Sequence, residues 1–221
     1  MGVYSMAMSG ELRYVQAPVP VHFPEAEQVP ETKQHFRLRT LLYEFLALAF
    51  ADRATIGSDQ FMYWDPTDPK ACLAPDAFVR LGEPDHLFRS WKVWERGAPQ
   101  LAIEVISDSD ERDRDWDAKL QRYRRLGVQE LIRFDPEASE PTRVLRIWDA
   151  VDGNLAEREV SGTVAQSRVL PGHWVIVDDA ALGPTLRLSH DALGANLYLT
   201  ASESAEARVR ELEAELGRRA T

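Results

Sequence analysis

The chain has 221 residues, of which 44% are hydrophobic and 28% are charged, and its formal net charge at pH 7 is −10. This length allows one domain with a substantial core, with or without a tail. The negative charge argues against a protein that coats nucleic acid through bulk electrostatics, although a local basic groove and a bound divalent cation would still permit a nuclease.

The sequence gives no sign of membrane insertion or secretion. No stretch approaches the ~20 consecutive apolar residues that span a bilayer, and the N-terminus lacks a basic segment followed by an apolar core. The single cysteine, Cys72, excludes an intrachain disulfide and is most simply a buried filler. We therefore expect a cytoplasmic protein with no membrane partner.

The first half of the chain is predicted to hold one long helix and several strands. Residues 1–30 contain four prolines, which predict an irregular arm. A broad apolar face predicts a largely buried helix over about 32–51. Strands are expected over 55–64 and 75–79, followed by a long connection over 80–98. A connection of that length is often functional, and packing of its tryptophans is the alternative.

The middle of the chain follows a strand–helix–strand pattern. An almost wholly apolar run predicts a buried strand over about 101–106. A helix is expected over about 112–126, ended by Gly127, because glycine is favoured just beyond a helix end. A further strand should cover 130–134, and alternating polar and apolar residues predict a half-buried strand over 143–148.

The last part of the chain is predicted to add short strands and a terminal helix. Residues 152–154 resemble a hairpin turn into a strand over 155–160, and further strands are expected near 167–170 and 174–177. Thr200 and Glu203 fit a capping box. The helix that follows carries an apolar stripe of a/d type, formed by Ala205, Val209, Leu212 and Leu216. Such a helix would dock on a partner or on its own domain, and a homodimer is plausible.

Together these elements predict an α/β or α+β fold with a mixed central sheet flanked by helices, extra β-strands and a C-terminal helical tail. The corresponding division of the chain is an arm over 1–30, a main domain over 31–199 and an amphipathic helix over 200–221.

Glu104 is the most informative residue, because it interrupts the apolar strand. An unpaired carboxylate buried there would cost several kcal/mol, so a metal, a cation or a proton should compensate it. Strand alternation places Ala102, Glu104 and Ile106 on one face. A structural ion pair with an arginine is the alternative explanation.

Two other polar residues could join Glu104. On a helical wheel of ~100° per residue, Lys119 falls within the apolar arc of the helix over 112–126, on the face that packs against the sheet. A lysine that covers apolar surface with its stem is the alternative. Asp76 opens the strand over 75–79, although an Asp after Pro75 is often only a turn residue.

The order of these residues resembles the PD-(D/E)XK nuclease superfamily and, more narrowly, the Uma-type restriction endonuclease-like family. The matching segments are LAPDAFVRLG (73–82), GAPQLAIEVISDSD (97–110), RDRDWDAKLQRYRRLGV (112–128), QELIRFDPE (129–137) and LPG (170–172). The superfamily pattern expects a lysine two residues after Glu104, where this chain has Ile106. The Uma-type family resembles this chain in placing the lysine on the next helix, at Lys119.

The resemblance implies a restriction-endonuclease-like core and a metal-dependent endonuclease that hydrolyses phosphodiester bonds, with DNA as its partner. Asp76, Glu104 and Lys119 would be the catalytic residues. Asp76, Glu104 and the carbonyl of Val105 would bind Mg²⁺, or Mn²⁺ in its place. Lys119 would orient the attacking water or neutralise charge on the transition state, and the electrostatic role is favoured because a lysine near phosphate stays charged.

Other residues are weaker candidates. Glu44 could be an accessory acid, and a solvated position is the simpler interpretation. Five arginines could contact phosphate, although a solvated helix face explains them equally: Arg112, Arg114, Arg122, Arg124 and Arg125. The five histidines show no zinc-ligand spacing, and no nucleophile elbow, phosphate loop or dinucleotide fingerprint occurs. Two function classes remain: a metal-dependent endonuclease, and a catalytically silent nuclease-fold protein that acts as a binding module.

Overall fold

The computed structural model describes residues 31–107, 116–160 and 162–219. Its helices are α1 (Lys33–Phe50), α2 (Val93–Arg96), α3 (Trp116–Leu126), α4 (Pro141–Val144) and α5 (Ala201–Arg219). Its strands in the first half of the chain are β1 (Ala54–Gly57), β2 (Met62–Tyr63), β3 (Cys72–Leu73), β4 (Ala77–Leu81), β5 (Trp91–Lys92) and β6 (Leu101–Val105). The later strands are β7 (Glu130–Phe134), β8 (Leu145–Val151), β9 (Asn154–Arg158), β10 (Val164–Gln166), β11 (His173–Asp179) and β12 (Gly183–Ser189).

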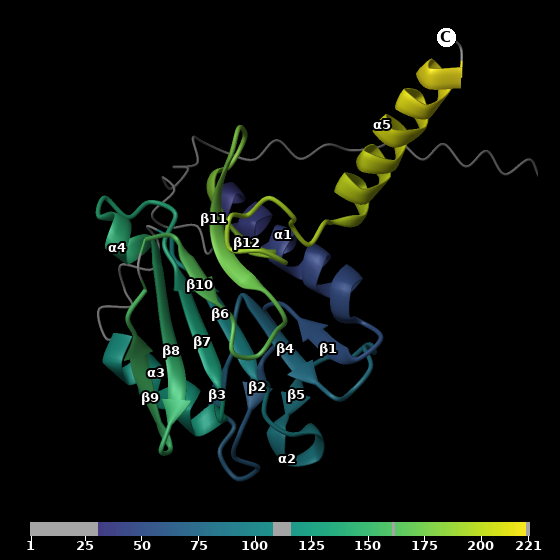
Figure 1. Cartoon of the computed structure of the whole chain (residues 1–221). Coiled ribbons are helices and arrows are strands. Elements are labelled where there is room, and N and C mark those ends of the chain that lie inside the picture. Colours follow the sequence, from purple (N-terminus) through teal and green to yellow (C-terminus); the bar gives the residue numbers. More distant parts are fainter. Residues whose placement is uncertain (1–30, 108–115, 161, 220–221) are drawn as a thin grey trace, which may run out of the picture.

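A six-stranded mixed sheet forms the centre of the molecule (Figure 1), with the strand order β1-β4-β6-β7-β8-β9. Strands β6 and β7 are parallel, and α3 belongs to the crossover between them, whereas the other neighbours in the sheet are antiparallel. Two three-stranded sheets, β10-β11-β12 and β3-β2-β5, add to it. The predicted α/β fold with a mixed central sheet, extra strands and a C-terminal helix is confirmed.

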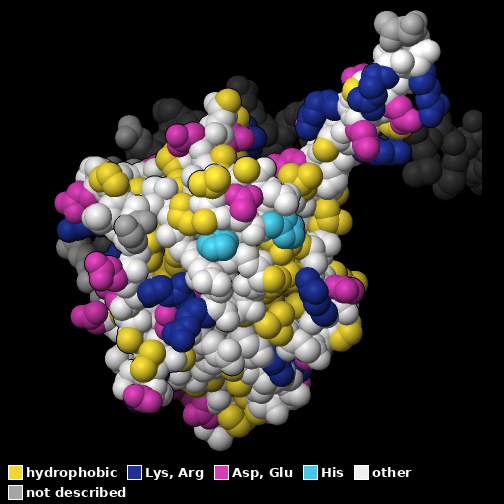
Figure 2. Space-filling model, in the orientation of Figure 1, with side chains coloured by type: hydrophobic (Ala, Val, Ile, Leu, Met, Phe, Trp, Pro, Cys, Tyr) yellow, Lys and Arg dark blue, Asp and Glu magenta, His cyan; other side chains and the backbone are white. Residues whose placement is uncertain are grey.

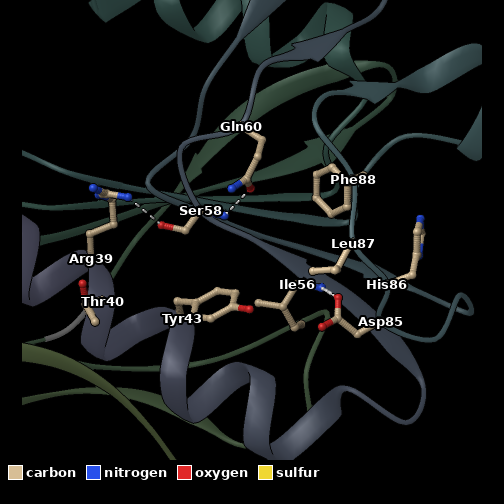
Figure 3. A pocket seen from close by; sticks show the side chains of 10 residues that line it. All are labelled: Arg39, Thr40, Tyr43, Ile56, Ser58, Gln60, Asp85, His86, Leu87 and Phe88. Carbon is tan, nitrogen blue, oxygen red and sulfur yellow. Dashed lines mark hydrogen bonds between the residues drawn. The ribbon is translucent and has the colours of Figure 1, made fainter. Parts of the chain in front are cut away.

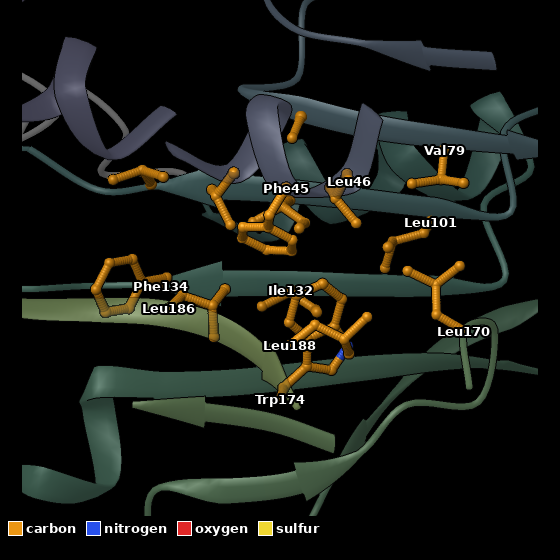
Figure 4. Packing of buried hydrophobic residues seen from close by; sticks show 14 of the residues in the cluster. Phe45, Leu46, Val79, Leu101, Ile132, Phe134, Leu170, Trp174, Leu186 and Leu188 are labelled. Carbon is orange, nitrogen blue, oxygen red and sulfur yellow. The ribbon is translucent and has the colours of Figure 1, made fainter. Parts of the chain in front are cut away.

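The two faces of the central sheet carry separate apolar clusters. On one face, Leu101, Ile103 and Val105 of β6 pack with α1 and with β11 and β12 (Figure 4). On the other face, Ala102 of β6 joins a cluster that includes α3 and the sheet β3-β2-β5. Strand β6 is therefore buried on both faces, and the side of Ala102 is also the side of Glu104.

Helix α1 begins where its sequence predicts. The side chain of Thr32 caps the helix by accepting a hydrogen bond of 3.1 Å from the backbone N–H of His35. The buried face of the helix is narrower than its composition suggests. Its inward residues are Leu38, Leu42, Phe45, Leu46 and Phe50. Phe36 and Leu48 remain about half exposed, because they lie outside the face of α1 that is buried against the rest of the protein.

The long connection over 80–98 holds β5 and α2, and its two tryptophans differ. Trp91 is fully buried and donates its indole N–H to the carbonyl of Gly97 at 2.8 Å, so packing explains this residue. Trp94 is exposed. Cys72 is only partly buried, so the prediction that it fills the core is wrong.

Three strand predictions need correction. The run over 55–64 is two strands, because the positive φ of Asp59 turns the chain between β1 and β2. The run over 143–148 begins in α4, where Pro141 stands in the first helical turn. The segment 167–170 is not a strand, because its N–H groups turn toward the buried carboxylate of Glu130 and the hydroxyl of Ser167.

Strand β12 was not predicted, because Gly183 and Pro184 at its start are residues typical of turns. The hairpin over 152–154 is present, and Asp152 and Gly153 both have the positive φ that a type I′ turn requires.

Helix α5 projects from the rest of the molecule (Figure 1). Its capping box is confirmed, since Thr200 and Glu203 exchange hydrogen bonds of 2.8 and 3.2 Å. The exposed apolar stripe contains Val209, Leu212 and Leu216. Figure 2 shows basic and acidic side chains alternating along this helix. Among the described residues, no helix is long and apolar enough to cross a membrane. The division of the chain at residues 30 and 200 stays a prediction.

Candidate active site

The candidate site lies where β4 begins and β6 ends. These strands are antiparallel, and Ala77 lies opposite Ile103 in their register. Asp76 directly precedes Ala77, and Glu104 directly follows Ile103, so the two carboxylates come from the same end of two neighbouring strands. Both side chains are buried, with relative exposures of 8% for Asp76 and 6% for Glu104. The sheet itself thus brings together two carboxylates that lie far apart in the sequence.

Asp76 is held by the backbone of β6. Its Oδ2 atom accepts a hydrogen bond of 2.8 Å from the backbone N–H of Val105. This bond continues the β4–β6 pairing by one position, with a side chain in place of a backbone carbonyl. Asp76 is therefore more than a turn residue, because its carboxylate is fixed beside the last residue of β6.

Glu104 is surrounded by groups from α3. Lys119 Nζ lies 3.0 Å from its Oε2 atom, and Tyr123 donates its hydroxyl hydrogen to Oε1. Burial, together with the nearby charge of Asp76, raises the pKa of Glu104 to about 7 against the lowering effect of the Lys119 charge. The sequence predicted that a metal, a proton or a cation compensates the charge of Glu104. In this structure the ammonium group of Lys119 is such a cation.

A second cation, Arg133, belongs to the same face. It lies directly across from Glu104 in the β6–β7 register. Lys119 and Arg133 both lie over the ring of Trp116, at 5.8 and 5.6 Å from its centroid. Arg133 also forms an ion pair of 3.0 Å with Asp135. The carboxylates are therefore bordered by two positive charges on the α3 side of the sheet.

His35 reaches the site from α1, on the opposite face. Its Nε2 atom lies 3.0 Å from the carbonyl oxygen of Val105 and 3.3 Å from Oδ1 of Asp76. Its Nδ1 atom lies 3.0 Å from Glu31 Oε1. Burial would lower the pKa of His35, but the bonds and charges of Asp76 and Glu31 outweigh it and raise the pKa to about 9. The ring is therefore protonated at pH 7 and donates from both nitrogens.

Comparison with known proteins identifies the family. Residues 25–181 match the Uma2 family, whose description is "Putative restriction endonuclease". The chain belongs to the Uma2 family. No curated protein matches it.

Among solved structures, the chain is similar to the crystal structure of "a putative nuclease belonging to DUF820" from Anabaena variabilis. The sequence identity is 13%, the alignment covers 54% of this chain and 69% of that chain, and the TM-score is 0.35.

Membership of the Uma2 family makes the chain a member of a nuclease family, and the structure brings the predicted residues of that family together. Asp76 contacts Val105, Glu104 contacts Lys119, and the carbonyl of Val105 lies at the same strand end. Their catalytic and metal-binding roles stay predictions.

The weaker candidates lie elsewhere. Glu44 is exposed, which supports a solvated position. The exposed Arg122 and Arg124 donate to the carbonyls of Cys72 and Gly153. Arg112 and Arg114 lie outside the described residues. Among the described residues, Lys119 and Arg133 are the two cations over the ring of Trp116 beside the carboxylates, and the basic groove expected for DNA stays a prediction.

Sequence reasoning overlooked three residues of this candidate site: His35, Tyr123 and Arg133. Two of them left a signal. Arg133 interrupts the apolar run of β7 just as Glu104 interrupts β6, and Tyr123 stands one helical turn after Lys119 on the same stripe. His35 left none, because a histidine in the first turn of a helix has many ordinary explanations and its partners lie far away in the sequence.

Proposed function

We propose that this chain is a metal-dependent endonuclease that hydrolyses phosphodiester bonds in DNA. The observation that carries the proposal is the meeting of two buried carboxylates, Asp76 and Glu104, with the ammonium group of Lys119 at one end of the central sheet. Membership of a nuclease family gives the reaction class. Cleavage within DNA, the need for a metal and the role of each residue are part of the proposal.

The donor set suits a hard divalent cation. Asp76 and Glu104 offer carboxylate oxygens, and Val105 offers a carbonyl oxygen at the same strand end, which are the ligands that Mg²⁺ and Mn²⁺ prefer. The carboxylate of Glu104 is buried and desolvated, so added positive charge would be favourable there. Such an ion would polarise the scissile phosphate and lower the pKa of the attacking water.

Side chains of α3 orient the carboxylate of Glu104 and supply positive charge where the scissile phosphate would bind. Tyr123 holds one oxygen of Glu104 and so fixes the direction of the carboxylate. Lys119 is placed to neutralise negative charge that builds up on the phosphate in the transition state. Arg133, across from Glu104 on β7, adds a second positive charge for the same purpose. Because a lysine near a phosphate stays protonated, Lys119 acts electrostatically and not as a general base.

In this proposal His35 supplies the positive charge at Asp76 while no metal ion is bound. Its imidazolium binds the Asp76 carboxylate and the Val105 carbonyl together, and Glu31 holds the other ring nitrogen. Glu31 is in turn held by two hydrogen bonds from Arg39, of 2.9 and 3.1 Å. A chain of contacts from α1 thus compensates the charge of Asp76, and a metal ion at Asp76 and the Val105 carbonyl would take the place of the imidazolium.

Two observations favour a second candidate, a catalytically silent binding module. Among the described residues there is no group of three or more His, Cys, Asp or Glu side chains that could hold a metal, and the net charge of −10 opposes nucleic acid. Among the described residues, the proposed site has two carboxylates, so it depends on Val105 and on the substrate phosphate to complete the shell of ligands. A cytoplasmic location and a homodimer formed through α5 are also proposed.

A nicking assay tests the function. Purified full-length protein should convert supercoiled plasmid to the open circle with Mg²⁺ or Mn²⁺, and EDTA should stop the reaction. Glu104→Ala and Lys119→Ala should each abolish nicking, whereas Glu95→Ala, which removes an exposed carboxylate on α2, should leave it unchanged. Full activity in either site variant would refute the assignment. No nicking with either metal, together with no metal-dependent shift in melting temperature, would favour the binding module.

A further inference from the structure

A row of charged side chains crosses the central sheet next to the carboxylate site. Glu104 of β6 lies directly opposite Arg133 of β7, and Arg133 lies directly opposite Arg146 of β8. Both arginines are on the α3 face of the sheet, because Leu131 and Trp148, two positions away along the same strands, belong to the apolar cluster on that face. Neighbouring strands are ~4.8 Å apart, so Arg146 lies about 10 Å across the sheet from Glu104.

The placement of Arg133 opposite Arg146 is unfavourable in the protein alone, because like charges directly opposite one another on antiparallel strands are destabilising. Among the described residues, each arginine pairs with one carboxylate: Asp135 lies 3.0 Å from Arg133, and Glu157 lies 2.7 Å from Arg146. The side chain of Glu157 is 44% exposed, so its ion pair with Arg146 is weak and exchangeable. An anion bound beside both guanidiniums would relieve the repulsion between them.

Both guanidiniums keep donors that the protein does not use. Arg133 donates to Asp135 through Nη2, and its Nε and Nη1 groups have no hydrogen-bond partner among the described residues. Arg146 donates to Glu157 through Nε and Nη2, at 2.7 and 2.8 Å, which leaves its Nη1 group without a partner in the same part of the chain. The fork of N–H groups on a guanidinium matches the oxygens of a phosphate.

Two tryptophans support the cations of this row. Lys119 and Arg133 both lie over the ring of Trp116. Arg146 lies over the ring of Trp148, with its Cζ atom 4.8 Å from the centroid. The two rings pack on each other, and their centroids are 5.2 Å apart. A guanidinium that lies over an aromatic ring keeps the N–H groups at its edge available, so the three cations share one aromatic support and remain able to bind an anion.

The other direction across the sheet, from β6 past β4 to β1, is unfavourable for a phosphate. A hollow of about 280 Å³ lies at that edge, between α1, the end of β1 and the segment 83–88 (Figure 3). Its arginine, Arg39, donates to Glu31 through two nitrogens and to the hydroxyl of Ser58 through the third. The exposed carboxylate of Asp85, which also lines the hollow, would repel an anion. The charges therefore favour a path toward β8.

We propose that Arg146, with Arg133 beside it, binds a phosphate of the substrate strand within about three nucleotides of the bond that is cut. This spacing follows from the ~10 Å between Glu104 and Arg146 across the sheet and the rise of ~3.4 Å per nucleotide along a duplex strand. The DNA strand then crosses β7 and β8 on the α3 face. The inference rests on the proposed function and deepens it, because it gives the path of the DNA and a residue that binds it away from the metal.

The test measures binding and not cleavage. Full-length protein, with Ca²⁺ in place of Mg²⁺, is titrated into a short fluorescent DNA duplex at salt concentrations between about 50 and 200 mM. The slope of the logarithm of the association constant against the logarithm of the salt concentration counts the phosphate contacts. Arg146→Met should weaken binding about tenfold at the lowest salt, because a charge-assisted contact is lost. The slope should become shallower by about 0.9, the contribution of one phosphate contact.

A second variant should act in the opposite direction. Glu157→Gln removes the carboxylate that competes for Arg146, so it should tighten binding about two- to fivefold, the strength of an exposed ion pair. Arg219→Met and Glu215→Gln are the matched controls, because they break an exposed ion pair of 2.7 Å on α5, away from the central sheet (Figure 1). They change the net charge by the same amounts and should alter neither the affinity nor the slope.

The outcomes separate this inference from the proposed function. If the protein nicks plasmid but Arg146→Met keeps the affinity and slope of wild type, the path is refuted and the nuclease stands. If Arg146→Met and Glu157→Gln weaken binding alike and lower the melting temperature alike, their ion pair only supports the fold, and the path is again refuted. Wild type that binds no duplex would also refute it. If the two variants change binding in opposite directions without any nicking by wild type, the nuclease proposal fails and the path stands.

Discussion

Tyr123 donates its hydroxyl hydrogen to Glu104, although the two residues are 19 positions apart and belong to different layers of the fold. The phenol comes from the buried face of α3, and the carboxylate comes from the end of β6. The contact holds the Oε1 atom of Glu104, while Lys119, one turn earlier on the same helix, holds Oε2. The direction of a proposed metal ligand is therefore set by helix packing.

Tyr123→Phe should weaken metal binding without unfolding the protein. The substitution keeps the buried ring and removes only the hydrogen bond to Glu104, and loss of a contact that orients a metal ligand typically costs about 10–100-fold in metal affinity. Isothermal titration with Mn²⁺ measures the effect, and Tyr63→Phe, on β2, is the matched control. Unchanged affinity in Tyr123→Phe would show that the phenol does not position Glu104 for a metal.

His35→Ala should make the protein more dependent on a divalent cation. In the metal-free protein the imidazolium is the positive group that bridges Asp76 and the Val105 carbonyl. Its removal should cost about 2 kcal/mol of stability, or roughly 4–8 °C in melting temperature. Because a metal ion would then compensate Asp76 instead, the rise in melting temperature on adding Mg²⁺ should be larger in the variant than in wild type.

The comparison of melting curves in EDTA and in Mg²⁺ measures both effects. His190→Ala, a change to an exposed histidine that stacks on Tyr198 outside the site, is the control. An equal or smaller Mg²⁺ shift in His35→Ala would mean that His35 helps to hold the metal and does not stand in for it.

The local pattern of the sequence was sufficient for much of the main sheet and for the facing of Glu104 and Lys119, whereas Asp76 joined the proposed triad only through the family resemblance. A buried strand with one acidic residue, and a helix with one lysine on its apolar face, predict that Glu104 and Lys119 face each other, and their atoms lie 3.0 Å apart. Both predictions depend only on the periods of strand and helix. The bounds of β7 were also found, because its apolar run is closed by Asp135-Pro136.

The parts that escaped prediction depend on contacts across the fold. His35 and Val105 are 70 residues apart, and their contact follows from the angle at which α1 crosses the sheet, which no local pattern encodes. The segment 167–170 has the composition of a strand, but the carboxylate of Glu130, 37–39 residues away, binds the hydroxyl of Ser167 and the N–H groups of Arg168 and Val169. Polar groups that are distant in the sequence can thus override the preference of a segment for the strand conformation.

The ion pair between Glu203 and Arg187 should make stability dependent on pH. Arg187 is buried, and Glu203 accepts from it in two hydrogen bonds of 2.8 Å. Burial would raise the pKa of Glu203, but the bonds from Arg187 and Thr200 outweigh it and lower the pKa below 4.5. A carboxylate with a lowered pKa stabilises the fold above the unfolded value of 4.5, and this stabilisation is lost as pH falls through the folded pKa.

Glu203→Gln should therefore cost about 1–3 kcal/mol at neutral pH, because a buried guanidinium loses its counter-charge. The cost should shrink at an acid pH below the folded pKa, where Glu203 of the wild type is also neutral. Urea unfolding at both pH values measures the difference. Glu206→Gln, in an exposed pair with Arg210, should cost little at either pH. An equal cost of Glu203→Gln at both pH values would exclude the ion pair as its cause.

Helix α5 should form a parallel two-stranded coiled coil with a second copy of the chain. Its exposed stripe repeats every three or four residues, and Arg208 and Glu213 flank the stripe five positions apart, the spacing that pairs across a parallel dimer. An antiparallel pair would instead bring Glu206 near Glu213. Arg208 is held by Glu211 on its own helix when α5 is alone, so pairing exchanges one ionic partner for another.

Charge exchange distinguishes these arrangements by sedimentation or light scattering. Removal of residues 200–221 should give a monomer. In a parallel dimer, Glu213→Arg and Arg208→Glu should each weaken association, because each places like charges opposite one another, and the double variant should restore it. In an antiparallel dimer Glu213→Arg alone would strengthen association, because it relieves the repulsion from Glu206. A wild-type chain that stays monomeric at high concentration would show that the stripe serves some other partner.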